Sequence, residues 1–190
     1  TMKAPYADDA GNSGIPRYDP ATLNRMTAER ARAGFQIGFH AIGDRAAAMA
    51  LDAFEGAQAT LKMNPSAIAP AERRNRIEHA QVVDPADIAR FKALNVVASM
   101  QPNHLLTDMR WAEARLGRSR AKYSYAWKAF LDAGVPLAFG TDYPVEPVTP
   151  FRGLYAAVTR KDEAGKQTYY PENALTIAQA LYAYTQGSAY

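Results

Sequence analysis

The strongest constraint on the fold of this chain is a pattern that occurs three times along it. An amphipathic helix ends at a glycine or an asparagine, a short apolar strand follows, and the strand ends in polar residues. Because parallel strands are joined by helical crossovers, this alternation indicates a parallel sheet covered by helices rather than an antiparallel sandwich. It leaves a doubly wound sheet or a (β/α)8 barrel.

Each of the three predicted helices has residues suited to both of its ends. The side chains predicted to cap the helix starts are Asp19, Asp84 and Ser124. The residues predicted to end the helices in a left-handed conformation are Gly34, Asn95 and Gly134. The strands that follow are predicted at residues 35–40, 96–102 and 136–144.

Two further helices and a fourth strand complete the predicted order. One helix starts near Asp44, which we interpret as its cap, and the proline-containing loop 63–72 separates it from a strand at residues 75–80. The last helix is predicted to begin at Thr176, where Gln179 completes a capping box.

The sizes of the strand side chains favour the barrel over the doubly wound sheet. Because strand side chains alternate between two faces, Gly38 lies on the face of His40, and Ala138 lies on the face of Asp142. Small residues suit a crowded barrel axis, and the larger residues between them suit contact with helices. A barrel needs eight strands and only four are found, so we expect residues 1–190 to be a single domain, half of a barrel.

Polar residues lie at or just past the carboxyl end of every predicted strand. They are His40, His79, Asp142 and the stretch Gln101 to His104. In parallel α/β folds, ligands bind at this carboxyl edge of the sheet. All three histidines of the chain lie at or just past strand ends, and two imidazoles with one carboxylate form a plausible set of ligands for a divalent metal.

Each of these residues also has a structural interpretation. A single histidine after a strand is more often a structural hydrogen-bonding residue than a ligand, and Asp142 would also suit a turn. We interpret Glu78 as structural, because it should face the opposite side of its strand from His79. For Gln101, Asn103 and His104, substrate contact and loop packing are equally open.

Composition excludes several kinds of protein. There are no cysteines, so a disulfide or a cysteine nucleophile is excluded, and no apolar run approaches the roughly 20 residues that span a bilayer. The net charge is +3, and the densest basic stretch, residues 72–76, lacks interleaved aromatic residues. We therefore expect neither nucleic acid nor a membrane as a partner, and we expect a cytoplasmic location.

Several motifs together resemble a known family. They are "QIGFHAIGDRA", "NRIEHAQ", "SMQPNH", "DMRWAEARLG" and "LAFGTDYPVEP", which occur in that order along the chain. They resemble the metal-dependent amidohydrolase superfamily, and within it the family 3 branch that includes YtcJ-like proteins and N-substituted formamide deformylases. The resemblance covers essentially the whole chain.

The resemblance implies a fold and a metal site. Members are (β/α)8 barrels, usually with a small β-sandwich, and hold one or two divalent ions, with zinc the ion expected here. The metal ligands implied are His40 and His79, after the fifth and sixth strands, and Asp142, after the eighth. The family's His-x-His pair and the bridging lysine or acidic residue have no counterpart, so the chain resembles strands five to eight of a longer protein.

The resemblance also implies an activity. It is hydrolysis of an amide or related C–N bond in a small molecule by metal-activated water, with Asp142 as general base. His104 is expected to contact the substrate, and Tyr143 is expected to shape its pocket. We expect the chain alone to be inactive unless a second copy or a missing half completes the barrel. The alternatives are a non-catalytic or degenerate barrel, and an iron site on a different fold.

Overall fold

The computed structural model of the chain describes residues 1–62 and 73–190. Within them, four parallel strands form one sheet in the order in which they occur in the chain. The strands are β1 (Gly38–Ala41), β2 (Arg76–His79), β3 (Val97–Met100) and β4 (Leu137–Phe139). The predicted α/β class, with its parallel sheet, is confirmed, whereas the predicted loop 63–72 lies outside the described residues.

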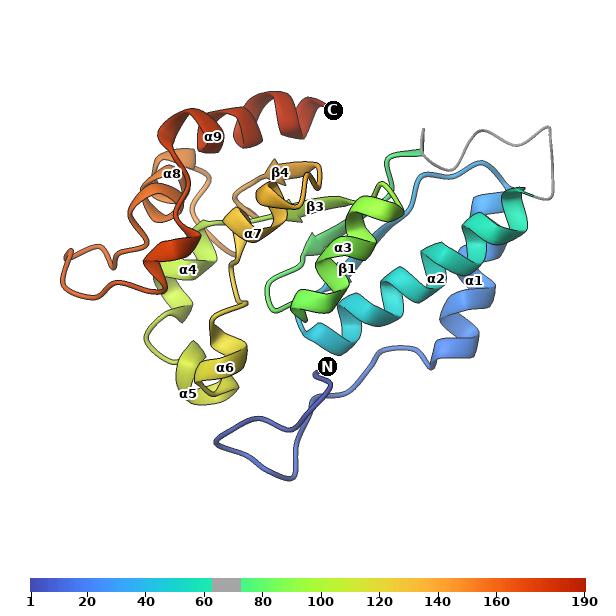
Figure 1. Ribbon diagram of the computed structural model, residues 1–190, viewed down its shortest axis with the longest axis horizontal. Coiled ribbons are helices and arrows are strands. Elements are labelled where there is room, and N and C mark those ends of the chain that lie inside the picture. Colours follow the sequence, from blue (N-terminus) through green and yellow to red (C-terminus); the bar gives the residue numbers. More distant parts are fainter. Residues whose placement is uncertain (63–72) are drawn as a thin grey trace.

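Helices precede or follow each strand (Figure 1). The longer ones are α1 (Pro20–Arg32), α2 (Asp44–Lys62), α3 (Pro85–Ala93) and α8 (Pro150–Thr159). The shorter ones are α4 (Asn103–Asp108), α5 (Ala112–Leu116), α6 (Arg118–Ala121), α7 (Trp127–Asp132), η2 (Pro171–Asn173), α9 (Ile177–Tyr182) and the π-helical turn η3 (Ala183–Gly187).

Most of the predicted helix ends are confirmed by their hydrogen bonds. The carboxylates of Asp19 and Asp84 accept from the backbone N–H groups of the first helical turns. Thr176 and Gln179 form the reciprocal capping box before α9. The residues predicted to end helices adopt positive φ angles, which are 90° at Gly34, 51° at Asn95 and 68° at Gly134.

One predicted cap is wrong, and another lies one residue inside its helix. Helix α7 begins at Trp127 with Ala126 in the capping position, while the buried Ser124 hydroxyl donates to the carbonyl of Ala121. Asp44 is the first residue of α2, and its carboxylate accepts from the backbone N–H groups of Arg45 and Lys3. In both places the side chain bonds to a neighbouring segment, which a local capping pattern does not reveal.

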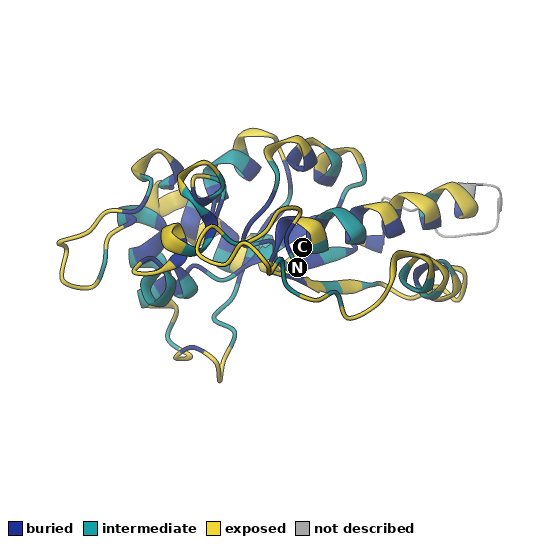
Figure 2. Cartoon of the chain, turned by 90° about the horizontal axis from the view of Figure 1, so that it is seen from below, coloured by how far each residue is buried: buried dark blue, intermediate teal, exposed yellow. Residues whose placement is uncertain are grey.

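The sheet has one face packed against helices and one exposed face. Phe39 of β1 lies against Phe54 of α2 with ring centroids 5.0 Å apart, and Phe139 of β4 lies 5.9 Å from Trp127 of α7. Buried residues gather where the helices meet the sheet, and the outer faces of the helices are exposed (Figure 2). Gly38 and His40 lie on the exposed face.

Register places Glu78 on the opposite face of β2 from Ile77, as strand alternation predicts for the residue next to His79. Glu78 pairs with His40 on one side and with Ser99 on the other, so it lies on the exposed face of the sheet together with His40. There it forms an ion pair with Arg76, two residues earlier on the same strand. This face of β2 carries two charged residues, rather than the small residues found on β1 and β4.

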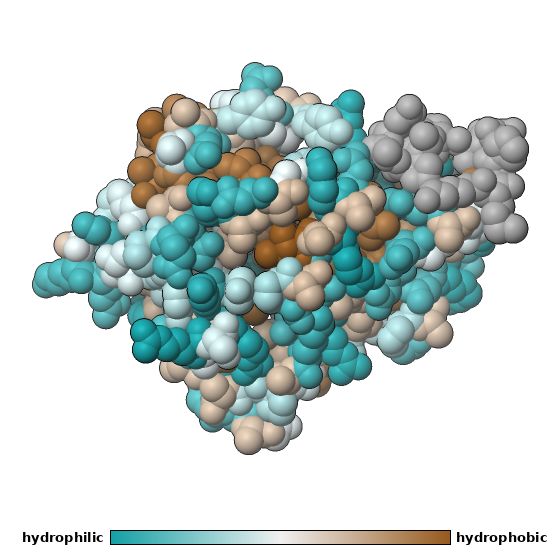
Figure 3. Space-filling model, viewed as in Figure 1, coloured by the Kyte–Doolittle hydropathy of each residue, from teal (hydrophilic) through white to brown (hydrophobic). Residues whose placement is uncertain are grey.

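The end of the chain lies beside β4. Ser188, just after η3, donates a hydrogen bond to the carbonyl of Phe139, and η3 contacts β4. An apolar area lies at the upper left of Figure 3, over α8 and α9. The exposed large apolar residues of these two helices include Phe151, Ile177 and Leu181. In the part of the chain that the structure describes, no helix is long and apolar enough to cross a bilayer.

Candidate metal centre

His79 lies at the centre of the polar residues that follow the strands. It ends β2 with a φ of 74°, and Ala80 follows with a φ of 43°, so the chain leaves the strand in a left-handed conformation. Strand alternation would place His79 on the helix-packed face with Ile77, but this turn brings its ring to the edge of the sheet. Its ring centroid lies 4.6 Å from that of His40 and 5.7 Å from that of His104.

The environment of His79 favours a neutral imidazole. Burial lowers the pKa of His79, and the neighbouring His40 lowers it further. The buried Nδ1 atom of His79 has no hydrogen-bond partner among residues 1–62 and 73–190. A neutral ring with an unpaired nitrogen is the form of histidine that binds a metal ion.

Asp142 and His104 complete a compact group with His79. Asp142 follows β4 with a φ of 60°, and its Oδ2 lies 3.1 Å from Nε2 of His104, the second residue of α4. One ligand atom from each of His79, His104 and Asp142 lies within 4.8 Å of the others. Carboxylate and imidazole are ligands that zinc and related divalent ions accept, so this donor set fits a metal.

The structure therefore brings some of the predicted site residues together and leaves others outside the group. His79 and Asp142 lie together, and His104, predicted as a substrate contact, lies within the same group. His40 is exposed, and its ring packs edge-on against His79 beside that group. Tyr143 follows Asp142 with 67% of its surface exposed.

A hydrogen-bonded network that the sequence reasoning missed supports the same edge of the sheet. Gln81, two residues after His79, donates to Asp108 and to the hydroxyl of Tyr125, and that hydroxyl in turn donates to Asp108. Burial and the Asp108 carboxylate raise the pKa of Tyr125 well above its ordinary value. Asp108 lies one helical turn after His104 on α4, so the network ties the end of β2 to that helix.

Glu146 is a second residue that the sequence reasoning missed. It is 6% exposed, and its Oε1 lies 3.6 Å from Nδ1 of His104, on the opposite side of the ring from Asp142. The available sequence signal was its position in "DYPVEP", four residues after Asp142. Its neighbours Thr107 and Arg152 come from α4 and α8.

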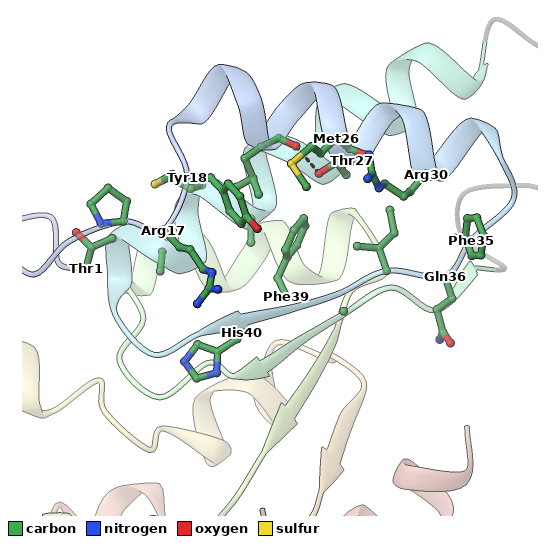
Figure 4. A pocket seen from close by; sticks show the side chains of 17 residues that line it. Thr1, Arg17, Tyr18, Met26, Thr27, Arg30, Phe35, Gln36, Phe39 and His40 are labelled. Carbon is green, nitrogen blue, oxygen red and sulfur yellow. Dashed lines mark hydrogen bonds between the residues drawn. The ribbon is translucent and has the colours of Figure 1, made fainter.

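A groove of about 710 Å³ lies elsewhere, between α1 and β1 (Figure 4). Phe39 points into it beneath α1, while His40 points to the other side of the strand. Its wall is largely apolar, with Leu23, Met26 and Ile37 among its residues, and none of the described residues that line it is acidic. The described lining of the groove includes His40 but no carboxylate, so it offers no histidine–carboxylate pair of the kind found beside His79.

Comparison with known proteins agrees with the metal-site chemistry. A model of the amidohydrolase family matches residues 1–190. The chain belongs to the amidohydrolase family. It is 35% identical over 190 residues to YtcJ of Bacillus subtilis strain 168, covering 99% of this chain and 34% of that protein. It is also 23% identical over 181 residues to the N-substituted formamide deformylase of Arthrobacter pascens, covering 93% of this chain and 31% of the deformylase.

A solved structure extends the similarity to three dimensions. The match is an uncharacterized metal-dependent hydrolase from Pyrococcus horikoshii OT3, with 37% sequence identity and a TM-score of 0.84. The alignment covers 99% of this chain and 36% of the hydrolase. The chain thus spans about a third of the length of the family members that it matches.

Proposed function

We propose that residues 1–190 form the second half of a (β/α)8 barrel in a longer amidohydrolase, called the full-length protein below. Four parallel strands in chain order, with polar residues after three of them, support this arrangement. The similarity to a metal-dependent hydrolase at a TM-score of 0.84 supports it further. The exposed face that carries Gly38 and His40 is then the barrel interior.

The observation that carries the proposed function is the group of His79, His104 and Asp142 at the carboxyl ends of the strands. His79 and Asp142 would hold a divalent metal, for which zinc suits the nitrogen and oxygen ligands. His40 is the third ligand implied by the family resemblance, and its exposed ring lies beside the group, with its centroid 4.6 Å from that of His79. His104, bonded to Asp142, would contact the substrate or serve as a further ligand.

The reaction is hydrolysis of an amide or related C–N bond in a small molecule. The residues of this site would hold a divalent ion, which when bound would supply Lewis-acid chemistry, polarising the carbonyl group and lowering the pKa of the attacking water. Asp142 accepts the proton of that water and delivers it to the leaving nitrogen, so that the amine departs neutral. His104 holds Oδ2 of Asp142 at 3.1 Å and thereby orients the carboxylate for this transfer.

The choice of a C–N bond rests on the family and on one named relative. The matched deformylase acts, by its name, on N-substituted formamides. Tyr143, exposed beside Asp142, is placed to contact the part of a substrate that lies outside the metal site. The 190-residue chain alone would turn over little substrate, because its barrel face is exposed to water and a water-filled site weakens the electrostatics of catalysis.

Substitution of Asp142 by asparagine in the full-length protein tests the proposed base. The change keeps the size of the side chain and removes its proton affinity, so kcat for an amide substrate should fall by about 100- to 10,000-fold. Asp132→Asn on α7 is the matched control, since that carboxylate is 60% exposed and pairs with Lys128. Turnover by Asp142→Asn at the rate of the control variant would refute the role of Asp142.

A further inference from the structure

Glu146 is a buried carboxylate on the far side of His104 from Asp142. It is 6% exposed, and burying a carboxylate is costly unless partners compensate for the lost hydration. Its Oε1 accepts a hydrogen bond from the hydroxyl of Thr107 at 2.9 Å, and its Oε2 lies 3.4 Å from Nη1 of Arg152. Both carboxylate oxygens are therefore engaged, and the group is held in one orientation.

The held carboxylate lies against the His104 ring. Oε1 of Glu146 is 3.6 Å from Nδ1 of His104, while Nε2 of the same ring is 3.1 Å from Oδ2 of Asp142. The imidazole thus has a carboxylate beside each of its nitrogens. A ring flip would exchange a nitrogen for a carbon at both carboxylates, so the pair of contacts selects one ring orientation.

We infer that Glu146 is a positioning residue that fixes the His104 ring, so that Nε2 faces Asp142 in the metal site. This role rests on the proposed function, since it serves the carboxylate proposed to bind the metal and act as base. Thr107 supports the arrangement, because its hydroxyl joins Glu146 to α4, the helix that carries His104. Carboxylates in this outer position orient metal-site side chains in many enzymes.

The chain supplies a matched control for a purely structural role. Arg152 lies 2.8 Å from Glu163 as well as 3.4 Å from Glu146, but Glu163 is 63% exposed. Glu163→Gln therefore removes an Arg152 ion pair without removing the carboxylate beside His104. A difference between Glu146→Gln and Glu163→Gln reports on the His104 contact.

The test measures binding of Co²⁺ to the metal-free full-length protein, read from the visible absorption of the bound ion. We expect Glu146→Gln to weaken Co²⁺ binding by about 10- to 100-fold and to change the absorption band, with an unchanged thermal midpoint. Glu163→Gln should match the wild type in Co²⁺ affinity, absorption band and thermal midpoint. In a His104→Ala background, adding Glu146→Gln should change the Co²⁺ affinity by less than about twofold, because the contact is already lost.

Each other outcome counts against the inference. If Glu146→Gln binds Co²⁺ as Glu163→Gln does, or weakens binding equally with and without His104, Glu146 does not act through His104. If Glu146→Gln loses its cooperative melting transition, Glu146→Asp is tested in its place under the same criteria. Aspartate keeps the negative charge but has a shorter side chain, so its carboxylate lies farther from the His104 ring. A wild-type protein that binds no Co²⁺ would instead refute the proposed metal site, and the role of Glu146 would fall with it.

Discussion

Replacement of Arg160 by methionine should destabilise the protein, although it removes a buried charge. The Arg160 side chain is fully buried after α8, where Nε donates to the carbonyl of Tyr169 and Nη1 donates to the carbonyl of Tyr125. The guanidinium also lies 4.5 Å from the centroid of the Trp127 ring. Methionine fills a similar volume but leaves both carbonyls without these donors.

Opposing contributions set the size of the effect. Each buried carbonyl left unpaired costs about 1–3 kcal/mol, and loss of the desolvated cation–π contact costs about 1–2 kcal/mol. In the other direction, burial lowers the pKa of Arg160 from 12.5 to about 10. That lowering corresponds to about 3 kcal/mol against the charged form, which methionine relieves. Together these contributions range from no net change to a loss of about 5 kcal/mol, and the midpoint is a loss of about 2–3 kcal/mol in the free energy of unfolding.

Urea unfolding of the full-length protein, followed by circular dichroism, measures this loss. Arg25→Met on α1 is the control, because Arg25 is 62% exposed and its pair with Glu29 contributes less than about 0.5 kcal/mol. An Arg160→Met variant as stable as the control would refute the reasoning. It would mean that relief of the buried charge outweighs the two carbonyl contacts, as replacement of some buried ions by apolar side chains does.

Three further predictions concern packing, backbone freedom and pH. A Cβ at Gly153 would collide with the hydroxyl of Tyr184, so Gly153→Ala should lower the free energy of unfolding by about 1–3 kcal/mol. Gly56→Ala on α2 should raise the free energy of unfolding by about 0.5–1 kcal/mol, because a Cβ there meets no described atom within 4 Å. If both glycine variants melted at the same temperature as the wild type, both predictions would be contradicted. The Lys3 ammonium lowers the pKa of Asp84 below 3.8, so this pair stabilises the fold above pH 3.8 and the stabilisation is lost as the pH falls through the lowered value. Lys3→Met should therefore reduce stability more at pH 7 than at pH 2, in urea titrations, and an equal loss at both values would be inconsistent with this linkage.

The sequence predicted those parts of the fold whose cause is local. Asp19 and Asp84 cap helices, and the glycine and asparagine at helix ends are left-handed, because these effects involve neighbouring residues only. The parallel order of the strands followed from their alternation with helices. Ser124 was assigned wrongly because its hydroxyl bonds to Ala121 and Tyr169, and the Tyr169 contact is 45 residues away in the chain.

The types of residue at the candidate site and the sheet edge where they lie were predictable from the sequence, but the contacts between them were not. Histidine and aspartate after parallel strands indicated the edge of the sheet, where His79 and Asp142 lie. The positive φ angles at His79 and Asp142, which re-aim both side chains, have only a weak signal in the sequence, because histidine and aspartate adopt such angles more often than most residues but far less often than glycine. The group also includes His104, and Glu146 lies against it, because α4 and the segment after β4 meet in three dimensions. Such a meeting of distant segments is set by packing rather than by any local pattern.

The most direct test of the proposed metal site is the metal content of the full-length protein, measured by plasma mass spectrometry after dialysis. The wild type should retain about one or two equivalents of a divalent ion, with zinc expected from the ligand types. His79→Ala removes the ligand at the centre of the group and should lose tight binding. Gln58→Ala on α2 is the control, because the Gln58 amide donates to the carbonyl of Leu94 and is not part of the group, and it should keep the wild-type metal content. Background metal in the wild type, or an unchanged content in His79→Ala, would contradict the metal site.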